Sequence, residues 1–375
     1  MRAKIFVVPL FFISLIFSFI FIGCSKSSSG GSSSGGGGGG TTGPTILKDA
    51  SSIPVGVGIN YNLMKNNTGY SSLVKQQFDR VTAEYQMKHG ANVKNDGTYD
   101  FTQTDDFVNI AQTSGLTIHG HVLAWHQNNN ATYLHSLGTS AQVSAALKDW
   151  VTTMVTRYKN KVTGWDVANE VVIDGTGDLR TSSNSSASGG DVFYWADYLG
   201  RSYIDSAFRW ANAADPSAKL FINDYNLESD NRKLDSLIGI INHLKNAGIP
   251  IHGVGIQMHI NINTDNSGID NAFQKLTATG LLIHVSEMDV RINPSNATPF
   301  TPTQSLFDQQ AAKFRYVAES YFRNVPAAQR YGITVWDLTD ADSWIVTSGH
   351  IDYPTLFDSG FNKKTAFSQF ILGLQ

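Results

Sequence analysis

Two glutamates stand where apolar stretches of this sequence give way to polar residues. Glu170 lies near the end of the strand-like stretch 161–171, and Glu287 lies in 281–290, an apolar run that breaks into acids. A buried strand carries such groups only where they have partners. Hydrolysis of a glycosidic bond uses two carboxyl groups, one to protonate the leaving oxygen and one to attack the sugar or to activate water. The pair predicts this chemistry, although the residues alone do not assign the two roles.

Other polar side chains occur at the ends of the remaining strand-like stretches. Asn169, beside Glu170, could hold a sugar 2-hydroxyl. His259 and Asp289 could orient Glu287 and balance its charge. The further polar or aromatic residues at strand ends, or on the loops after them, are Glu84, Lys88, His119, His121, Trp125, His126, Asn223, Asp224, Tyr225, Gln257, Trp336, Asp340, Asp342 and Trp344. Such a ring predicts one site assembled from many strands.

Two other kinds of site could produce the same ring. The pairs His119-Gly-His121 and Gln257-Met-His259 place side chains two residues apart on one strand face, which could suit zinc. The middle strand ends, however, carry Asn, Glu and Asp where a metal hydrolase of this type would need further Lys or His. We therefore expect the histidines to hydrogen-bond carboxylates or substrate hydroxyls, with no metal and no cofactor. The second alternative is a binding barrel that catalyses no reaction.

The segments that must position these residues alternate between strands and helices. Strands are predicted at 55–60, 80–84, 117–123, 164–169, 220–224, 253–257, 282–287 and 333–336. Helices are predicted at 141–158, 194–213, 232–247 and 305–322, where apolar residues recur every three or four positions. This alternation predicts an α/β fold with a parallel sheet. Because no Gly-rich phosphate loop follows the first strand, a closed (β/α)₈ TIM barrel is favoured over a doubly wound sheet, and its catalytic groups would lie at the carboxyl ends of the strands. The Ser/Gly-rich patch 181–190 would then be an excursion on that face.

The composition is that of a globular chain with a neutral ligand. The 375 residues are 41% hydrophobic and carry a net charge of -3, so no broad basic field is available for nucleic acid. Seven Trp and fourteen Tyr supply flat surfaces that suit sugar rings, besides packing the core. We expect one catalytic domain over 44–375 and a monomer.

The first 43 residues are predicted to serve export rather than folding. Residues 1–23 have Arg2 and Lys4 before an apolar run and resemble a bacterial lipoprotein signal, in which Cys24, the only cysteine, becomes the lipidated first residue. An ordinary signal peptide or an uncleaved anchor are the alternatives. Residues 24–43 are nearly all Ser and Gly and predict a flexible tether. We expect an exported, membrane-anchored protein, periplasmic or on the cell surface, or else a secreted one.

At its polar strand ends the chain resembles the family 10 glycoside hydrolases, the endo-β-1,4-xylanases. The resemblance rests on five motifs in the family's order, Gly120-His-Val-Leu-Ala-Trp-His126, Trp165-Asp-Val-Ala-Asn-Glu170, Gly255-Ile-Gln-Met-His259, Val285-Ser-Glu-Met-Asp289 and Ile333-Thr-Val-Trp-Asp-Leu-Thr-Asp340. It implies a retaining double displacement on xylan or xylo-oligosaccharides, with Glu170 as acid/base and Glu287 as nucleophile. It also implies that the glycone subsites are lined by Glu84, Lys88, His121, Trp125, Asn169, Gln257, His259, Trp336 and Trp344, with Tyr225 on the aglycone side.

Three positions depart from the family pattern. Tyr85 stands where the family usually has Asn, and His89 where it has Trp, so the distal glycone subsite is expected to differ. Asp337 stands where a small residue such as Gly is common, and it could add a polar contact or face a loop. The departures keep open a related glycosidase acting mainly on a β-glucan or a mixed glycan. The tether and the aromatic residues keep open an inactive surface protein that only binds glycan.

Overall fold

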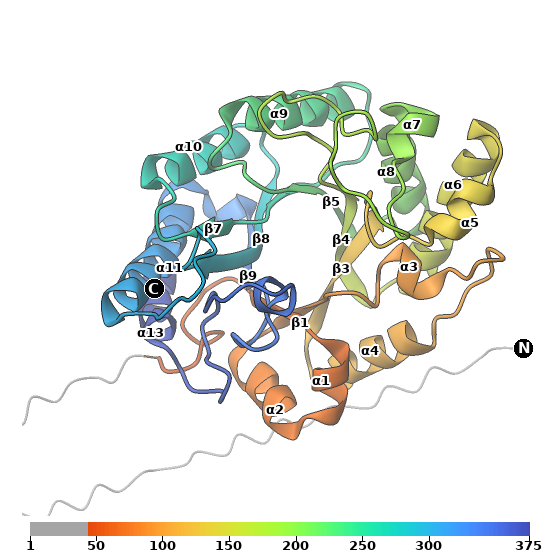
Figure 1. Cartoon of the computed structure of the whole chain (residues 1–375). Coiled ribbons are helices and arrows are strands. Elements are labelled where there is room, and N and C mark those ends of the chain that lie inside the picture. Colours follow the sequence, from red (N-terminus) through yellow and green to blue (C-terminus); the bar gives the residue numbers. More distant parts are fainter. Residues whose placement is uncertain (1–43) are drawn as a thin grey trace, which may run out of the picture. The chain divides into compact units, whose positions relative to one another are not determined.

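The computed structural model describes residues 44–375, and these form a closed parallel barrel surrounded by helices (Figure 1). The barrel strands are β1 (Val55–Ile59), β2 (Arg80–Ala83), β3 (Thr117–Ala124), β4 (Val162–Asn169), β5 (Lys219–Asp224), β6 (Gly253–Ile256), β8 (Leu282–Arg291) and β9 (Arg330–Val335). Each pairs in parallel with its neighbours, and the β1–β9 and β6–β8 pairings close the ring. The predicted (β/α)₈ TIM barrel is confirmed. The predicted signal, Cys24 and the tether lie outside the described residues.

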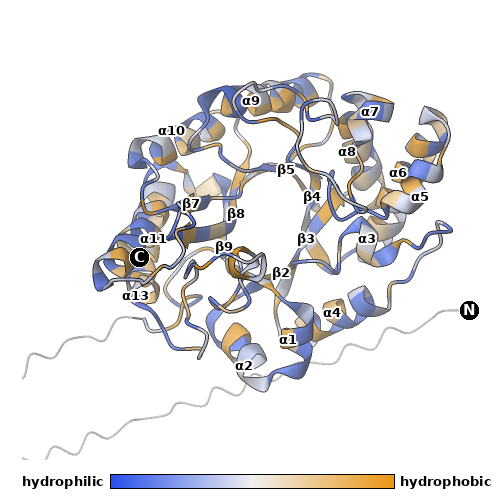
Figure 2. Cartoon of the chain, viewed as in Figure 1, coloured by the Kyte–Doolittle hydropathy of each residue, from blue (hydrophilic) through white to orange (hydrophobic). Residues whose placement is uncertain are grey.

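The longer helices lie around the barrel and turn their apolar sides toward it (Figure 2), whereas α12 lies on the connection after β9. The helices are α1 (Tyr61–Asn66), α2 (Thr68–Gln77), α3 (His89–Asn92), α4 (Thr102–Thr113), α5 (Ala131–Ser136), α6 (Ser140–Arg157), α7 (Trp195–Leu199), α8 (Ser202–Ala214), α9 (Asn231–Asn246), α10 (Asn266–Thr277), α11 (Gln304–Asn324), α12 (Trp344–Thr347) and α13 (Thr365–Leu374), with a 3₁₀ turn at Ala327–Gln329. Within residues 44–375, none of them has both the length and the apolar character needed to cross a bilayer.

Two elements differ from those predicted. The helix expected over 194–213 is two helices, because Gly200 has φ +55° in the left-handed region and its N–H closes α7 onto the Ala196 carbonyl. A ninth strand, β7 (His259–Asn261), pairs in parallel with the outer half of β8. It has only three residues, so no alternation marks it in the sequence.

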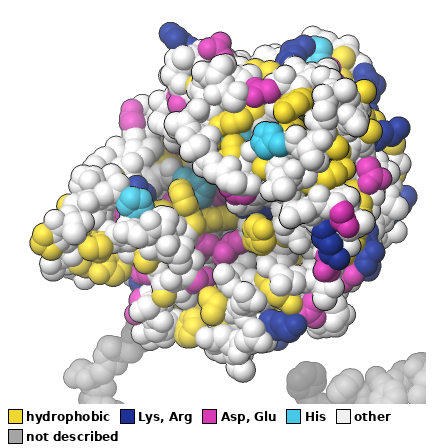
Figure 3. Space-filling model, turned by 45° about the vertical axis from the view of Figure 1, so that its right-hand side comes forward, with side chains coloured by type: hydrophobic (Ala, Val, Ile, Leu, Met, Phe, Trp, Pro, Cys, Tyr) yellow, Lys and Arg dark blue, Asp and Glu magenta, His cyan; other side chains and the backbone are white. Residues whose placement is uncertain are grey.

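Charged side chains of both signs are interspersed over the face shown in Figure 3. No patch of one sign dominates this face, in keeping with the near balance of 28 basic and 31 acidic residues in the whole sequence. This face therefore offers no electrostatic footprint for a polyanion.

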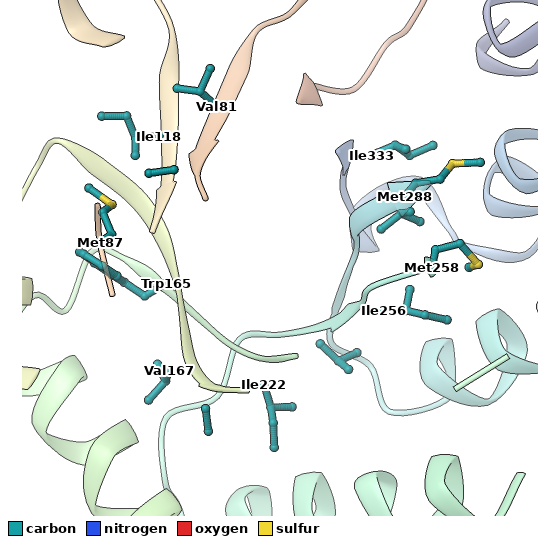
Figure 4. Packing of buried hydrophobic residues seen from close by; sticks show 14 of the residues in the cluster. Val81, Met87, Ile118, Trp165, Val167, Ile222, Ile256, Met258, Met288 and Ile333 are labelled. Atoms are coloured by element: carbon teal, nitrogen blue, oxygen red, sulfur yellow. The ribbon is translucent and has the colours of Figure 1, made fainter. Parts of the chain in front are cut away.

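The aliphatic core lies between the barrel and the helices. Val167, Ile222 and Ile256 point away from the barrel axis toward the surrounding helices (Figure 4), and each is fully buried. The inside of the barrel is different, because aromatic and polar groups fill it. At its amino-terminal end the rings of Phe221 and Tyr331 lie 4.5 Å apart. The barrel therefore has a filled floor, and only its carboxyl end is free to hold a ligand.

One glycine decides how β3 and β4 pack. Gly120 is paired with Trp165, and a Cβ on Gly120 would lie 2.2 Å from the Trp165 ring. Gly120 therefore leaves the space that the indole occupies beneath the strand ends.

We predict that Gly120→Ala lowers the free energy of unfolding by about 1–3 kcal/mol, because the new methyl group overpacks the ring. Gly239→Ala, on the exposed side of α9 where a Cβ meets nothing within 4 Å, should instead raise it by about 0.5–1 kcal/mol through helix propensity. Urea denaturation of both variants measures the difference. Equal stability of the two variants would contradict the packing argument.

Candidate active site

A cleft of about 640 Å³ opens at the carboxyl ends of the barrel strands. All the catalytic, supporting and subsite residues proposed from the sequence line it except Glu84, namely Lys88, His121, Trp125, Asn169, Glu170, Tyr225, Gln257, His259, Glu287, Asp289, Trp336 and Trp344. The other polar strand-end residues do not line it, except for His126. Further lining residues include Asn128, Arg180, Asn226 and Arg291. The barrel therefore brings residues that are distant in sequence to one face.

Glu287, on β8, is 5% exposed and is held by two donors. The Asn223 Nδ2 atom donates to Oε1 at 2.7 Å, and the His259 Nε2 atom donates to Oε2 at 3.3 Å. Burial by itself would raise the pKa of Glu287. The charge of His121 and the hydrogen bond from His259 outweigh burial and hold that pKa below its usual value. Glu287 is therefore kept as a carboxylate.

The donor His259 is itself held by Asp289. Its Nδ1 atom lies 2.6 Å from Asp289 Oδ2, which also accepts the indole N–H of Trp344 at 2.9 Å. Burial opposes a charge on His259, but the Asp289 and Glu287 carboxylates raise its pKa well above the usual value. A cationic imidazole donates from both ring nitrogens, so His259 can bind both carboxylates at once.

Glu170 follows β4 directly and has a more open environment. Its backbone has φ +55°, which turns the chain out of the strand, and its side chain is 12% exposed. Gln257 Nε2 donates to its Oε1 at 3.2 Å, and Arg180 Nε donates to its backbone carbonyl at 2.6 Å. The carboxyl group thus reaches the cleft from a fixed backbone position.

Asn169 connects the two glutamates through amide hydrogen bonds. Its Oδ1 atom accepts from Asn223 Nδ2 at 2.9 Å and from Gln257 Nε2 at 3.2 Å. Asn223 also binds Glu287, and Gln257 also binds Glu170. Because the carbonyl oxygen is occupied by these donors, the amide hydrogens of Asn169 face Glu170 and the cleft, with Nδ2 3.4 Å from Glu170 Oε1.

The two histidines of β3 converge on one carboxylate. Asp166 Oδ2 lies 2.9 Å from His121 Nδ1, and Asp166 Oδ1 lies 3.1 Å from His119 Nε2. Although burial would raise the pKa of Asp166, both imidazoles hold it well below its usual range. Within the described part of the chain, no group of three or more His, Cys, Asp or Glu side chains could hold a metal ion.

The cleft walls combine aromatic rings with cations. The Lys88 ammonium lies 4.6 Å from the Trp125 ring centre and donates to Asn128 Oδ1 at 3.1 Å. Burial lowers the pKa of Lys88. On another wall, the hydroxyl of Tyr225 accepts from Arg180 Nη2 at 2.8 Å. Flat rings with polar edges suit a ligand that presents both C–H faces and hydroxyls.

The three departures from the family pattern lie in different surroundings. His89 is buried, accepts the backbone N–H of Asn130 at 3.0 Å on Nδ1, and packs edge-on against Trp150, so it does not line the cleft. Burial lowers the pKa of His89 to about 3. Tyr85 is 43% exposed, directly after Glu84. Asp337 is buried in contact with Glu84, so it makes a polar contact rather than facing a loop.

Sequence reasoning listed Asn223 only among the polar strand ends and gave it no role, and it did not name Arg180. Asn223 is fully buried at the end of β5 and joins Asn169 to Glu287, and a polar residue at a strand end was its only signal. Arg180 lies on the long connection after β4 and binds the Glu170 and Val172 carbonyls. Its spacing from Glu170 carries no signal, because the contact depends on how the loop folds back.

Comparison with known proteins gives one family. The model of the family described as "Glycosyl hydrolase family 10" matches residues 45–372 of this chain. A Cellvibrio japonicus protein named "Endo-beta-1,4-xylanase Xyn10C" is 33% identical over 87% of this chain and 57% of its own length. The solved GH10 structure from Paenibacillus barcinonensis has a TM-score of 0.81 at 29% identity, covering 88% of this chain and 97% of that chain.

A second solved structure shows a relative with a ligand. It is a mutant xylanase 10C from Cellvibrio japonicus in complex with xylopentaose, with a TM-score of 0.79 and 32% identity, covering 88% of this chain and 69% of that chain. The present chain spans little more than half the length of the first curated relatives that it matches, at 57% and 55%.

We predict that His259→Asn raises the pKa of Glu287 by about one pH unit or more, because a buried carboxylate loses a cationic donor. Carboxyl ¹³C chemical shifts of labelled glutamate, followed through a pH titration, measure the change. His243→Asn is the matched control, because it removes a half-buried contact between His243 and Asp205 on the helix layer. An unchanged Glu287 pKa in His259→Asn would contradict the assigned charge partner.

Proposed function

The chain belongs to glycosyl hydrolase family 10, and on that premise we propose that it is an endo-β-1,4-xylanase that retains the anomeric configuration. The observation that carries the proposal is the pair of glutamates in one cleft with different surroundings. Glu287 is buried and held as a carboxylate by Asn223 and His259, whereas Glu170 is more exposed. A fixed anion and a nearby carboxyl of different environment are what a double displacement uses.

In the first step Glu287 acts as the nucleophile. Its carboxylate oxygen forms a bond to the anomeric carbon while the bond to the leaving oxygen breaks, and Glu170 donates its proton to that oxygen. Positive charge builds on the ring as these bonds change. The Asn169 amide can then strengthen its hydrogen bond to the 2-hydroxyl. The product is a glycosyl ester on Glu287 and a free shortened chain.

In the second step Glu170 acts as a base. It accepts a proton from a water molecule, whose oxygen attacks the anomeric carbon while the ester bond to Glu287 breaks. Glu170 regains its proton and Glu287 regains its charge, so the enzyme returns to its starting state. Two inversions give overall retention. The residues suffice for both steps, and the mechanism requires no cofactor.

A xylose polymer is the substrate that the comparisons favour. One solved relative is in complex with xylopentaose, and most of the curated relatives are named xylanases, whereas one, at 29% identity, is named "Exoglucanase XynX". The aromatic walls and the hydroxyl-binding amides of the present cleft suit the same chemistry. New reducing ends released from xylan test the activity, and soluble cellulose derivatives separate xylanase from β-glucanase. Tight xylan binding without hydrolysis would indicate a binding protein instead.

We predict that Glu287→Ala abolishes turnover of both xylan and aryl xylosides, because no nucleophile remains. Glu170→Ala should lower kcat/KM on xylan by about 100-fold or more while sparing aryl glycosides whose leaving group needs no proton. Steady-state kinetics on xylan and on dinitrophenyl xylobioside measure this. Equal losses on both substrates in Glu170→Ala would contradict the assigned roles.

We also propose that the protein is exported and anchored by lipid on Cys24. The sequence supports this through the apolar run that ends at the single cysteine and through the Ser/Gly-rich segment that follows it. An anchored enzyme on a long tether would reach polysaccharide that is too large to diffuse. The same features support a location in the periplasm or at the cell surface, with secretion as the alternative.

We predict that Cys24→Ser abolishes incorporation of an alkyne-tagged fatty acid in a bacterial host and moves the protein from the membrane to the soluble fraction. Xylan hydrolysis by the full-length Cys24→Ser protein should equal that of wild type, because Cys24 lies outside the catalytic domain, residues 44–375. Wild-type protein that carries no label and fractionates as soluble would sink the anchor proposal.

A further inference from the structure

Two carboxyl groups meet under the wall of the cleft. Asp337, 1% exposed on the connection after β9, is in hydrogen-bonding contact with Glu84 at the end of β2. The Glu84 Oε1 and Asp337 Oδ1 atoms are both buried, and neither has a hydrogen-bond donor. Two carboxylates offer only acceptors, so such a contact is satisfied when one of them carries a proton.

The other oxygen of Asp337 holds an aromatic residue of the cleft. Asp337 Oδ2 accepts the backbone N–H of Trp344 at 2.6 Å, which fixes the start of α12. Trp344 is 47% exposed, its ring lies 5.1 Å from the His259 ring, and its indole N–H donates to Asp289. Asp337 thus connects Glu84 to the aromatic residue that packs on the partner of Glu287.

The backbone conformation at Asp337 is costly for a residue that carries a side chain. Asp337 has φ +66°, in the left-handed region where glycine is favoured, and Asp tolerates this region better than most residues. A glycine would fit the turn more easily. It would leave the Trp344 N–H without its acceptor and Glu84 without its partner.

We propose that Asp337 is a positioning residue for the glycone side of the cleft, holding Glu84 and Trp344 in place through one proton shared with Glu84 and one backbone hydrogen bond. This inference rests on the proposed xylanase function. The task of Asp337 is to keep Glu84 and Trp344 in their positions on the glycone side of the cleft for as long as that proton is bound.

The surrounding charges set the pH at which the proton leaves. Burial raises the pKa of Glu84 to about 7 and that of Asp337 well above its usual value. Asp342, which accepts the Tyr70 hydroxyl at 3.0 Å, adds negative charge and favours the proton, whereas the Lys88 ammonium opposes it. Contact with Asp337 lowers the pKa of Glu84, and contact with Glu84 raises that of Asp337, so the shared proton is the one on Asp337 and is the last to leave. Once it has left, two buried carboxylates face each other, and their repulsion would loosen Glu84 and Trp344. Glycone affinity should therefore fall at alkaline pH, as the pair loses this last proton.

The test compares KM between pH 6 and pH 9 for aryl glycosides with one or three xylose units. Wild-type KM for the three-unit substrate should rise roughly threefold or more over this range, with little change for the one-unit substrate. In Asp337→Asn the amide donates permanently to Glu84 and still accepts from Trp344, so KM for the three-unit substrate should become flat. In Asp337→Gly KM should be raised at every pH, with kcat retained because neither catalytic glutamate is touched.

A stability readout is independent of activity. A carboxyl whose pKa rises from 4.5 to about 7 on folding contributes stability that is complete below pH 4.5 and lost as pH rises through about 7. The Tm of Asp337→Asn minus that of wild type should therefore grow between pH 5 and pH 8.

The two proposals fail in different ways. No hydrolysis of the three-unit substrate by wild type would defeat the proposed function, while the Tm comparison would still test the shared proton. The inference would be overturned if wild type hydrolyses the substrate but Asp337→Asn shows the same dependence of KM on pH. A Tm difference between the two proteins that does not change with pH would also overturn it.

Discussion

Keeping Glu287 charged inside a protein is the constraint on which the rest of this site depends. A buried carboxylate is tolerated only where hydrogen-bond donors and positive charge replace water. Here Asn223 from β5 and His259 from β7 supply the donors, and Asp289 on the same strand as Glu287 keeps His259 cationic. The donors come from different strands, and the pairing of β5, β6, β7 and β8 brings them to the anion.

The filled interior of the barrel explains why the chemistry occurs at one end. Aromatic rings such as Phe221 and Tyr331 form the floor, and Asp166 with the two histidines of β3 forms a polar layer above it. The amides that join the glutamates lie above that layer. Each layer positions the next, so a small error in packing near Trp165 would reach the carboxylates. Asp337 positions groups at the side of the cleft in the same way, because it contacts Glu84 and accepts a hydrogen bond from the backbone of Trp344.

Local sequence features predicted much of this arrangement. The apolar stretches that end in Glu170 and Glu287 indicated both the strands and the face where the polar groups meet, and the barrel follows from their alternation with helices. The split of the helix at Gly200 and the short strand β7 could not be predicted, because a single φ value and a three-residue pairing leave no periodic signal. The contacts of the residues that depart from the family pattern could not be predicted from the sequence either. Asp337 contacts Glu84 from the far end of the chain, and His89 turns out to pack on Trp150.

The central claim is that Glu287 is a preformed anionic nucleophile, and trapping its ester tests this most directly. A 2-deoxy-2-fluoro xylobioside with a dinitrophenyl leaving group slows breakdown of a glycosyl ester more than its formation. Peptide mass spectrometry of the inactivated enzyme then locates the attached sugar. The account predicts a disaccharide adduct on the peptide that contains Glu287, at the Glu287 side chain. An adduct on Glu170 or another carboxyl would contradict it, as would xylan hydrolysis with inversion and no adduct.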